Sequence, residues 1–376
     1  MTVLTTGRTP VRLVASLAAL TLGLSLAPAA SAAPTDQRST PRSALATDWQ
    51  ADELSNGAMV NDQFDFVDYG LTIDTLFSLV ADGRKLRYIN RIRTRLERKA
   101  EEYTTFGGTR FAGATAKLLV AAKVLREPVR DFGDRNRRLD VLRLVAGRAG
   151  RAAGSEHGRI RDSSARGGGT DFSNNIGQSY GVIGLSRTGG VPRPVVTYLL
   201  KQQCANGGFR QDPVVGKSCV RSGGRSSVDT TSLALQALLT AKQQGGARVP
   251  GTRIVRATRY LVRQQKDNGS FTLGRAQGPS NANSTGLAAQ ALRTASRPGP
   301  AAATRPWMRT VQIVRAEAGD GPARRDIGAI AFTRGALQVA LETGITPATR
   351  DQFRRATAQA VFAFTPVGLD QLAVPR

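Results

Sequence analysis

A motif that occurs twice constrains this chain more than any other feature. Residues 198–209, Tyr-Leu-Leu-Lys-Gln-Gln-Cys-Ala-Asn-Gly-Gly-Phe, return 62 positions later as residues 260–271, Tyr-Leu-Val-Arg-Gln-Gln-Lys-Asp-Asn-Gly-Ser-Phe. Residues 228–238, Val-Asp-Thr-Thr-Ser-Leu-Ala-Leu-Gln-Ala-Leu, return 54 positions later as residues 282–292. A period of this size with helical apolar spacing predicts a repeat whose unit is a pair of helices.

Two kinds of helix alternate along the chain. One kind begins at a small residue and is apolar on most faces, as buried helices are; it is predicted at 70–80, 113–122, 177–185, from 232, from 286, and at 328–340. The other kind is amphipathic and carries most of the arginine; it is predicted at 85–103, 134–152, 192–203, 252–265, 306–318 and 347–364. Six inner helices wrapped by six outer ones form an all-α toroid, an α6/α6 barrel. No apolar–polar alternation bounded by turn residues is sustained, so no strand is predicted.

The first 32 residues have the features of a secretory signal peptide. Arg8 and Arg12 form a basic region, residues 13–26 are a short apolar run, and Ala-Ser-Ala at 30–32 is a cleavage site. We predict cleavage after Ala32, a disordered leader over 33–46, a toroid domain over 47–365 and a C-terminal tail over 366–376. The mature chain is predicted to have no transmembrane segment and to be secreted and monomeric.

Two cysteines, Cys204 and Cys219, enclose 14 residues. In an oxidising, secreted setting they are expected to pair, and closing a loop of this size contributes about 3 kcal/mol in the chain-entropy model. Two free thiols or metal ligands remain the alternative.

Basic residues far outnumber acidic ones, with 53 Lys and Arg against 28 Asp and Glu and a net charge of +25. Such a surface attracts anionic polymers and membranes in general. The basic residues are scattered along the chain, however, so solubility and compositional bias are the simpler interpretation. An anionic cell-surface polymer stays a candidate partner, and no specific nucleic-acid site is predicted.

Both copies of the first motif carry an aromatic residue, aliphatic residues, glutamine, a short spacer and Gly-x-Phe. This resembles the repeat of squalene cyclases and their relatives, in which Gln and Gly-x-Trp/Phe fasten an outer helix to the next loop. With the six helix pairs, residues 45–365 resemble the prenyltransferase/squalene-oxidase-repeat family. Its α6/α6 toroids include terpenoid cyclases, protein prenyltransferase β subunits, cobalamin carriers and thioester domains. Residues 68–74, 206–209 and 283–292 look most like those of secreted actinobacterial repeat proteins.

The enzymatic motifs of that family are incomplete in this chain. The Asp-x-Asp-Asp acid of terpenoid cyclases is matched only by Ser-Val-Asp-Thr at 227–230, which keeps Asp229 alone, so we interpret Asp229 as a helix N-cap. The zinc ligands of prenyltransferases follow the order Asp, Cys, His, whereas His157 precedes both cysteines. The thioester motif Cys-Gly-Glu-Gln is absent from the sequence. No catalytic residue, metal or cofactor is therefore predicted.

A ligand site is predicted at the mouth where the inner-helix N-termini converge. Helix N-termini carry partial positive charge and free N–H groups, which favours a small polar or anionic ligand. The predicted liners are Asp68, Tyr69, Asp74, Asn174, Asn175, Gln178, Asp229, Thr230, Asn283 and Ser284. Asp74 lies one turn inside a buried helix, where a carboxylate needs a partner; it is either a paired structural group or part of the cavity wall. Asn283 opens an Asn-Ser-Thr glycosylation triplet, but its repeat position matches that of Asp229 and predicts an N-cap.

The sequence thus favours a secreted, non-catalytic ligand-binding or interaction protein. The alternative is a degenerate or unconventional terpenoid cyclase or prenyltransferase-like enzyme. Cavities that stabilise carbocations are lined with aromatic side chains, whereas only 6% of this chain is aromatic.

Overall fold

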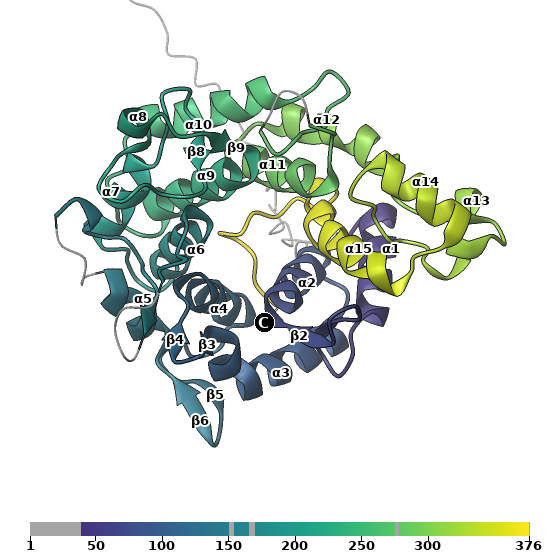
Figure 1. Cartoon of the computed structure of the whole chain (residues 1–376), viewed down its shortest axis with the longest axis horizontal. Coiled ribbons are helices and arrows are strands. Elements are labelled where there is room, and N and C mark those ends of the chain that lie inside the picture. The colour runs from purple at the N-terminus through teal and green to yellow at the C-terminus, as the bar shows by residue number, and fades with distance from the viewer. Residues whose placement is uncertain (1–38, 150–153, 165–169, 275–277, 376) are drawn as a thin grey trace, which may run out of the picture. The chain divides into compact units, whose positions relative to one another are not determined.

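Six inner helices close a ring in the described part of the chain. The computed structural model describes residues 39–149, 154–164, 170–274 and 278–375, within the unit Asp36–Arg376. The inner helices are α2 (Tyr69–Asp82), α4 (Ala112–Leu125), α6 (Asn175–Ser186), α9 (Val228–Gln243), α11 (Ala282–Thr294) and α15 (Pro347–Ala360). Each packs against the next, and α15 returns to α2 (Figure 1). The predicted signal peptide, its cleavage site and residues 33–38 lie outside the described residues.

A second layer of helices surrounds the ring (Figure 1). It consists of α1 (Pro41–Asp52), α3 (Leu86–Thr104), α5 (Val141–Ala149), α7 (Arg193–Lys201), α10 (Gly251–Gln264) and α12 (Pro298–Arg309). These helices are amphipathic: in α10, Ala257 and Leu261 are buried while Arg259 and Arg263 are exposed. Such helices bury one apolar stripe against the inner ring. The predicted fold class, an all-α toroid with six inner and six outer helices, is confirmed.

The prediction assigned the last inner and outer helices to the wrong segments. Residues 347–364, predicted to be outer, form the inner helix α15 and the short helix η3 (Val361–Ala363). Their arginines made the segment look exposed, but Arg354 is only 6% exposed because it forms an ion pair with Glu53 at 2.6 Å. Residues 328–340, predicted to be the sixth inner helix, form a buried loop followed by the peripheral helix α14 (Arg334–Thr343). The missing outer helix is α1, which begins at Pro41, inside the predicted leader.

Two other segments predicted as outer helices also differ from the prediction. The segment predicted as a helix over 134–152 begins instead with a hairpin of β5 (Phe132–Asp134) and β6 (Arg137–Leu139), before α5. The helix predicted from 306 begins at Pro298, since proline is tolerated in a first helical turn. A separate short helix, α13 (Arg315–Ala318), and η2 (Pro322–Arg325) then precede α14.

Short antiparallel strands were not predicted. The remaining ones are β1 (Met59–Asn61) with β2 (Phe66–Asp68), β3 (Thr105–Phe106) with β4 (Thr109–Arg110) and β7 (Ser163–Ser164), and β8 (Phe209–Arg210) with β9 (Ser226–Ser227). Elements of two or three residues are too short to show an alternating pattern. The loops also hold η1 (Gly154–Glu156) and α8 (Cys219–Ser222).

The twice-repeated motif is one of five equivalent loops, which we call staples. Each staple has a glycine with positive φ that lies against a backbone carbonyl of the next outer helix. The glycines, with the residues they face, are Gly57 with Arg91, Gly158 with Pro194, Gly207 with Arg256, Gly269 with Ala303, and Gly328 with Leu45. A Cβ at Gly269 would lie 1.8 Å from the Ala303 oxygen, so this close approach requires glycine.

The residue two positions after each glycine fastens the staple to an inner helix. The N–H of Phe209 donates to Thr231 Oγ1 at 2.8 Å, and that of Phe271 donates to Thr285 Oγ1 at 3.0 Å. Both phenylalanine side chains are 0% exposed, as predicted. The amide of Gln265 donates to Gly269 O and to Pro300 O of the next outer helix. The glutamine thus ties consecutive outer helices together.

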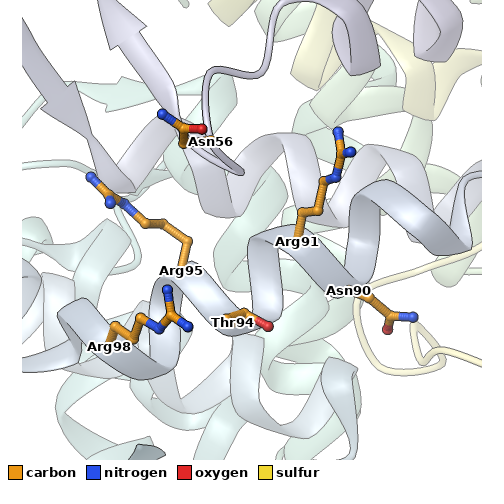
Figure 2. A pocket seen from close by; sticks show the side chains of 6 residues that line it. All are labelled: Asn56, Asn90, Arg91, Thr94, Arg95 and Arg98. Carbon is orange, nitrogen blue, oxygen red and sulfur yellow. The ribbon is translucent and has the colours of Figure 1, made fainter.

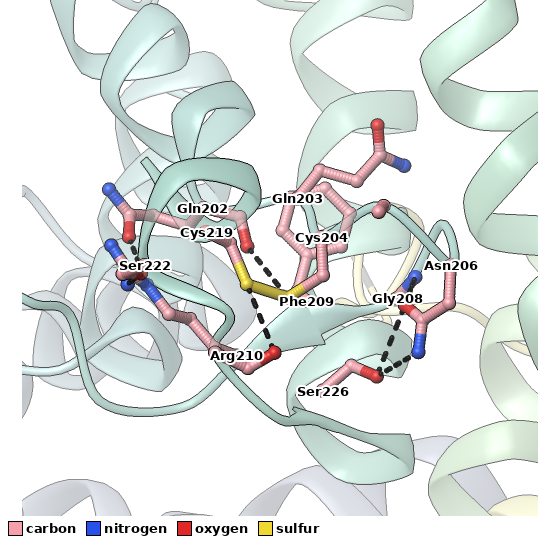
Figure 3. Close-up of a disulfide and its surroundings, with 12 residues drawn as sticks. Gln202, Gln203, Cys204, Asn206, Gly208, Phe209, Arg210, Cys219, Ser222 and Ser226 are labelled. Atoms are coloured by element: carbon pink, nitrogen blue, oxygen red, sulfur yellow. Dashed lines mark hydrogen bonds between the residues drawn. A yellow bond between two sulfur atoms is a disulfide. The ribbon is translucent and has the colours of Figure 1, made fainter. Parts of the chain in front are cut away.

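The predicted disulfide between Cys204 and Cys219 is confirmed, with a Cα–Cα distance of 4.7 Å (Figure 3). Arg210 lies beside it and is only 2% exposed. Its guanidinium donates to Gln202 Oε1, Ser222 Oγ and the Lys217 carbonyl, so a buried cation is held by neutral acceptors. Burial lowers the pKa of Arg210.

The last described residues enter the ring of inner helices (Figure 1). Their buried apolar side chains are Val367, Leu369, Leu372 and Val374. Arg187, at the C-terminal end of α6, donates to Leu369 O at 2.8 Å and to Leu372 O at 2.7 Å. Arg126, at the end of α4, donates to Val374 O at 2.8 Å. The segment predicted as a tail is therefore packed core that covers the C-terminal ends of the inner helices.

Candidate functional site at the N-terminal ends of the inner helices

The staples set the inner helices in a common register. The threonines that accept the staple N–H groups, Thr72, Thr231, Thr285 and Thr357, face the outer layer. At 100° per residue, positions two before and two after each threonine are turned by about 200° and face the inside of the ring. The inward positions nearest the N-termini are Gly70, Asp229, Asn283 and Arg355; one turn further in lie Asp74, Leu233, Leu287 and Gln359. The same register places Lys117 of α4 and Tyr180 of α6 at that second level.

The first group at this inner wall is the Asp229 cluster, which comprises Asp229, Ser232, Asn283 and Ser284. Asp229 and Asn283 occupy equivalent positions on the neighbouring helices α9 and α11. The Oδ1 atoms of both side chains are buried and make no hydrogen bond within the described residues, and the hydroxyl oxygen of Ser232 is likewise unpaired there. The Ser284 hydroxyl interacts with the Asp229 carboxyl group. Buried polar atoms in proteins nearly always have a partner, so three unpaired oxygens on neighbouring inner helices indicate a ligand or ordered water.

Burial changes the acidity of the carboxyl group in this cluster. The pKa of Asp229 is raised to about 6 because burial disfavours the charged form, and the Ser284 hydroxyl opposes this only in part. Asp229 therefore changes protonation near neutral pH. Carboxyl groups with such pKa values concentrate at functional sites.

The second group is the Lys117 cluster, which comprises Asp74, Tyr103, Lys117 and Tyr180. Lys117 Nζ lies 2.7 Å from Asp74 Oδ1, donates to Gly70 O at 2.9 Å and lies 5.7 Å from the centroid of the Tyr180 ring. The pKa of Tyr103 and that of Tyr180 are raised by burial and by the Asp74 charge. Both phenols therefore stay neutral and can donate hydrogen bonds. Asp74 is thus paired with Lys117 while its position also faces the inside of the ring, so the two alternatives left by the sequence do not exclude each other.

Capping side chains occupy the inner-helix N-termini. Asp68 caps α2 and also pairs with Arg355 of α15. Asn174 caps α6 by accepting from Ile176 N and Gly177 N.

The predicted caps of α9 and α11 were wrong by two residues. Ser227 rather than Asp229 caps α9, and Asn281 rather than Asn283 caps α11. This displacement is what leaves the Oδ1 atoms of Asp229 and Asn283 unpaired. These capping side chains accept hydrogen bonds from N–H groups that would otherwise be free to bind an anion. The helix N-termini therefore favour an anionic ligand less than the sequence suggested.

Four other predicted liners make contacts away from this wall. Tyr69 donates to Glu102 of α3 at 3.1 Å, so its hydroxyl faces the outer layer. Gln178 binds the Gly158 staple, and Asn175 donates to Arg210 O at 2.9 Å. Thr230 is 0% exposed and accepts from Ser227 Oγ at 2.8 Å. These side chains support the site and do not line it.

Sequence reasoning missed Lys117, Tyr180, Tyr103 and Arg355. A usable signal existed for the first, because Lys117 interrupts the otherwise small and apolar run at 113–122. A cation inside a buried helix needs a partner, and Asp74 in the preceding inner helix is the matching anion. Arg355 could not be found in this way, because its segment was taken for an outer helix.

No metal site emerges in the described residues, where no three His, Cys, Asp or Glu side chains gather closely enough to hold an ion. Nor is any described helix long and apolar enough to cross a membrane.

Comparison with solved structures identifies the class of fold. The chain is similar to Candida albicans protein geranylgeranyltransferase-I complexed with GGPP, with a TM-score of 0.52, 11% identity, and coverage of 81% of this chain and 88% of that one. At this identity the likeness shows the α/α toroid of the prenyltransferase type and nothing about activity.

Two further structures are similar at lower scores. Haptocorrin in complex with Cbi has a TM-score of 0.45 and 15% identity, with coverage of 88% of this chain and 68% of that one. A protein from Actinoplanes has a TM-score of 0.47 and 16% identity, with coverage of 86% and 97%. No protein-family model and no curated protein sequence matches the chain.

Proposed function

We propose that this protein is a secreted, non-catalytic ligand-binding protein whose ligand binds the inner wall of the toroid at the N-terminal ends of the inner helices. One observation carries the proposal: equivalent positions on α9 and α11 hold Asp229 and Asn283, each with a buried Oδ1 atom that has no partner among the described residues. A bound ligand would satisfy both atoms. The cost of leaving such groups unpaired is about 1–3 kcal/mol each, which a ligand would remove.

The chemistry of the wall selects the ligand class. The unpaired Oδ1 atoms are acceptors, so the ligand presents hydrogen-bond donors such as hydroxyl, amine or amide groups. Leu233 and Leu287 lie one turn below them and favour a partly apolar body. We therefore infer a small polar ligand with donors on one edge, in place of the anion favoured by helix N-termini alone. Secretion is supported by the disulfide, since such bonds persist in oxidising compartments.

The direct test is native mass spectrometry of protein purified from culture medium, followed by titration of any small molecule found. Asn283→Leu removes one of the two acceptors while keeping a similar volume, and should weaken binding at least about tenfold, as expected for one lost buried hydrogen bond. Asp267→Asn, in the exposed loop after α10, is the control and should leave the Kd unchanged. Equal affinities for wild type and Asn283→Leu would contradict the proposed site.

A second candidate function rests on the acidity of Asp229. A buried carboxyl group with a pKa of about 6 can serve as a general acid, as in a degenerate terpenoid cyclase-like enzyme. Incubation with squalene and shorter prenyl substrates, followed by gas chromatography, tests it. A cyclised product that disappears in Asp229→Asn would replace the binding proposal with an enzymatic one.

A further inference from the structure

A pocket of about 670 Å³ lies on the outer layer, beside α3 (Figure 2). It is lined by polar side chains only: Asn56, Asn90, Arg91, Thr94, Arg95 and Arg98. All but Asn56 project from α3, and Asn56 belongs to the Gly57 staple that rests on this helix. The pocket therefore lies at a staple, on the opposite side of the inner helices from the site proposed above.

Comparison of the five staples shows what is unusual at this one. Each staple glycine faces the carbonyl of one residue of the outer helix. We compare the residue four positions later on that helix, one turn further along. In four staples this residue is a buried aromatic: Trp49, Tyr198, Tyr260 and Trp307, none more than 6% exposed. In the staple at Gly57 the equivalent residue is Arg95. An arginine thus replaces the aromatic side chain that packs in this position elsewhere.

The neighbouring arginines also differ from their counterparts on α10. There, Arg256 donates to Cys204 O and Ala205 O, and Arg263 donates to Asn206 O, so both fasten their staple. The equivalent residues on α3 are Arg91 and Arg98, and in the described part of the chain neither makes a hydrogen bond to the Gly57 staple. The two outer helices thus have arginines at equivalent positions. Those on α10 bind their staple, whereas those on α3 do not and are available to another partner.

The positive charge of this pocket is balanced only in part: the charge of Arg95 helps to lower the pKa of Glu102, on the same helix, without forming a close ion pair. None of Arg91, Arg95 and Arg98 forms an ion pair within the described residues, although neighbours on other faces of α3 do, as Arg93 does with Glu127 at 3.0 Å. The Nε of Arg95 is buried and has no hydrogen-bond partner across the same residues, although the rest of its guanidinium group interacts with the Tyr69 hydroxyl. Arg95 lies 6.0 Å from the Tyr69 ring, and Arg91 lies 5.7 Å from the Tyr88 ring, contacts that hold the two guanidinium groups in place.

We propose that this pocket binds the phosphate group of a phosphorylated ligand. Guanidinium groups bind phosphate through paired hydrogen bonds, and a phosphate monoester carries about −1.5 to −2 charges, which suits three cations better than a single carboxylate does. Arg91 and Arg98 are separated by two helical turns, about 10 Å along the axis, so the pocket is long enough for more than one phosphate group. The source is either a small phosphate compound or a phosphate-containing polymer.

Calorimetric titration with inorganic pyrophosphate, and separately with linear polyphosphate, tests the proposal and separates the two sources. The informative variant is Arg95→Tyr, which restores the aromatic residue of the other staples and removes the central cation. It should reduce affinity for either probe at least about tenfold, the loss of one charge-assisted contact. Its thermal unfolding is measured alongside, and a folded variant is expected because four staples already carry an aromatic side chain there.

The control is Arg87→Ala, which removes one positive charge from the same helix. Arg87 is exposed and does not line the pocket. It should change affinity less than about twofold. Binding of pyrophosphate supports the small ligand, and binding of polyphosphate alone supports the polymer. Equal losses in Arg87→Ala and Arg95→Tyr, equal affinity for polyglutamate, or no binding of either phosphate probe would overturn the proposal.

Discussion

Replacement of Asp229 by asparagine should stabilise the protein near neutral pH. The carboxyl group is buried among unpaired oxygens, and its pKa is about 6 in the folded chain against about 3.9 in an unfolded one. Between these values the native state holds a proton that the unfolded state has released. The free energy of unfolding therefore falls as the pH rises from about 4 through about 6. An asparagine side chain at this position would have the same shape without the charge.

The size of the effect follows from the shift. A difference of about two pKa units corresponds to about 3 kcal/mol, which wild type loses in full above about pH 7. Asp229→Asn should thus exceed wild type by about 3 kcal/mol at about pH 7.5 and equal it near pH 4, where the native carboxyl group is protonated. Urea unfolding of both proteins in the absence of ligand, at several pH values, measures the difference.

The control for this experiment is Asp267→Asn, which neutralises an exposed aspartate and should change stability by less than about 0.5 kcal/mol at each pH. A difference between wild type and Asp229→Asn that does not vary with pH would refute the reasoning, because it would not come from ionisation. A variant less stable than wild type above neutral pH would show that the carboxylate has a favourable partner.

Three more outcomes are expected. Phe271→Ala should cost about 3–5 kcal/mol, since the ring is fully buried in a staple, and a loss below about 1 kcal/mol in urea unfolding would speak against that role. Cys204 and Cys219 should resist thiol labelling of the native protein, and reduction should cost about 3 kcal/mol; labelling without reductant would exclude the bond. Leu372→Ala should cost about 2–5 kcal/mol despite its place near the end of the chain, because it is 0% exposed; an unchanged midpoint would show that this segment is not core.

The sequence by itself predicted the α/α toroid, two of its staples and the disulfide. Two of the five staples were predicted, from the resemblance of Gln and Gly-x-Phe at fixed spacing to a known repeat. Only the glycine is strictly required, because of its positive φ and close contact; the other staples have Met59, Ile160 or Ile330 in place of phenylalanine. The pairing of Cys204 with Cys219 also followed from local spacing and compartment. These features show in the sequence because the residues that form them repeat at a regular spacing along the chain.

Which segment forms the sixth inner helix was decided only by tertiary structure. The arginines of α15 made the helix look exposed, but Arg354 and Arg355 are neutralised by Glu53 and Asp68, distant residues that only the closed ring brings near. Tertiary structure also determined which residues cap α9 and α11. The cap of α9 lies two residues before Asp229, about 200° around the helix, so Asp229 is on the inner wall and not at the cap. The spacing of apolar residues in a sequence predicts well where a helix lies along the chain. Its rotation and its ion-pair partners depend on long-range packing, which no local pattern encodes.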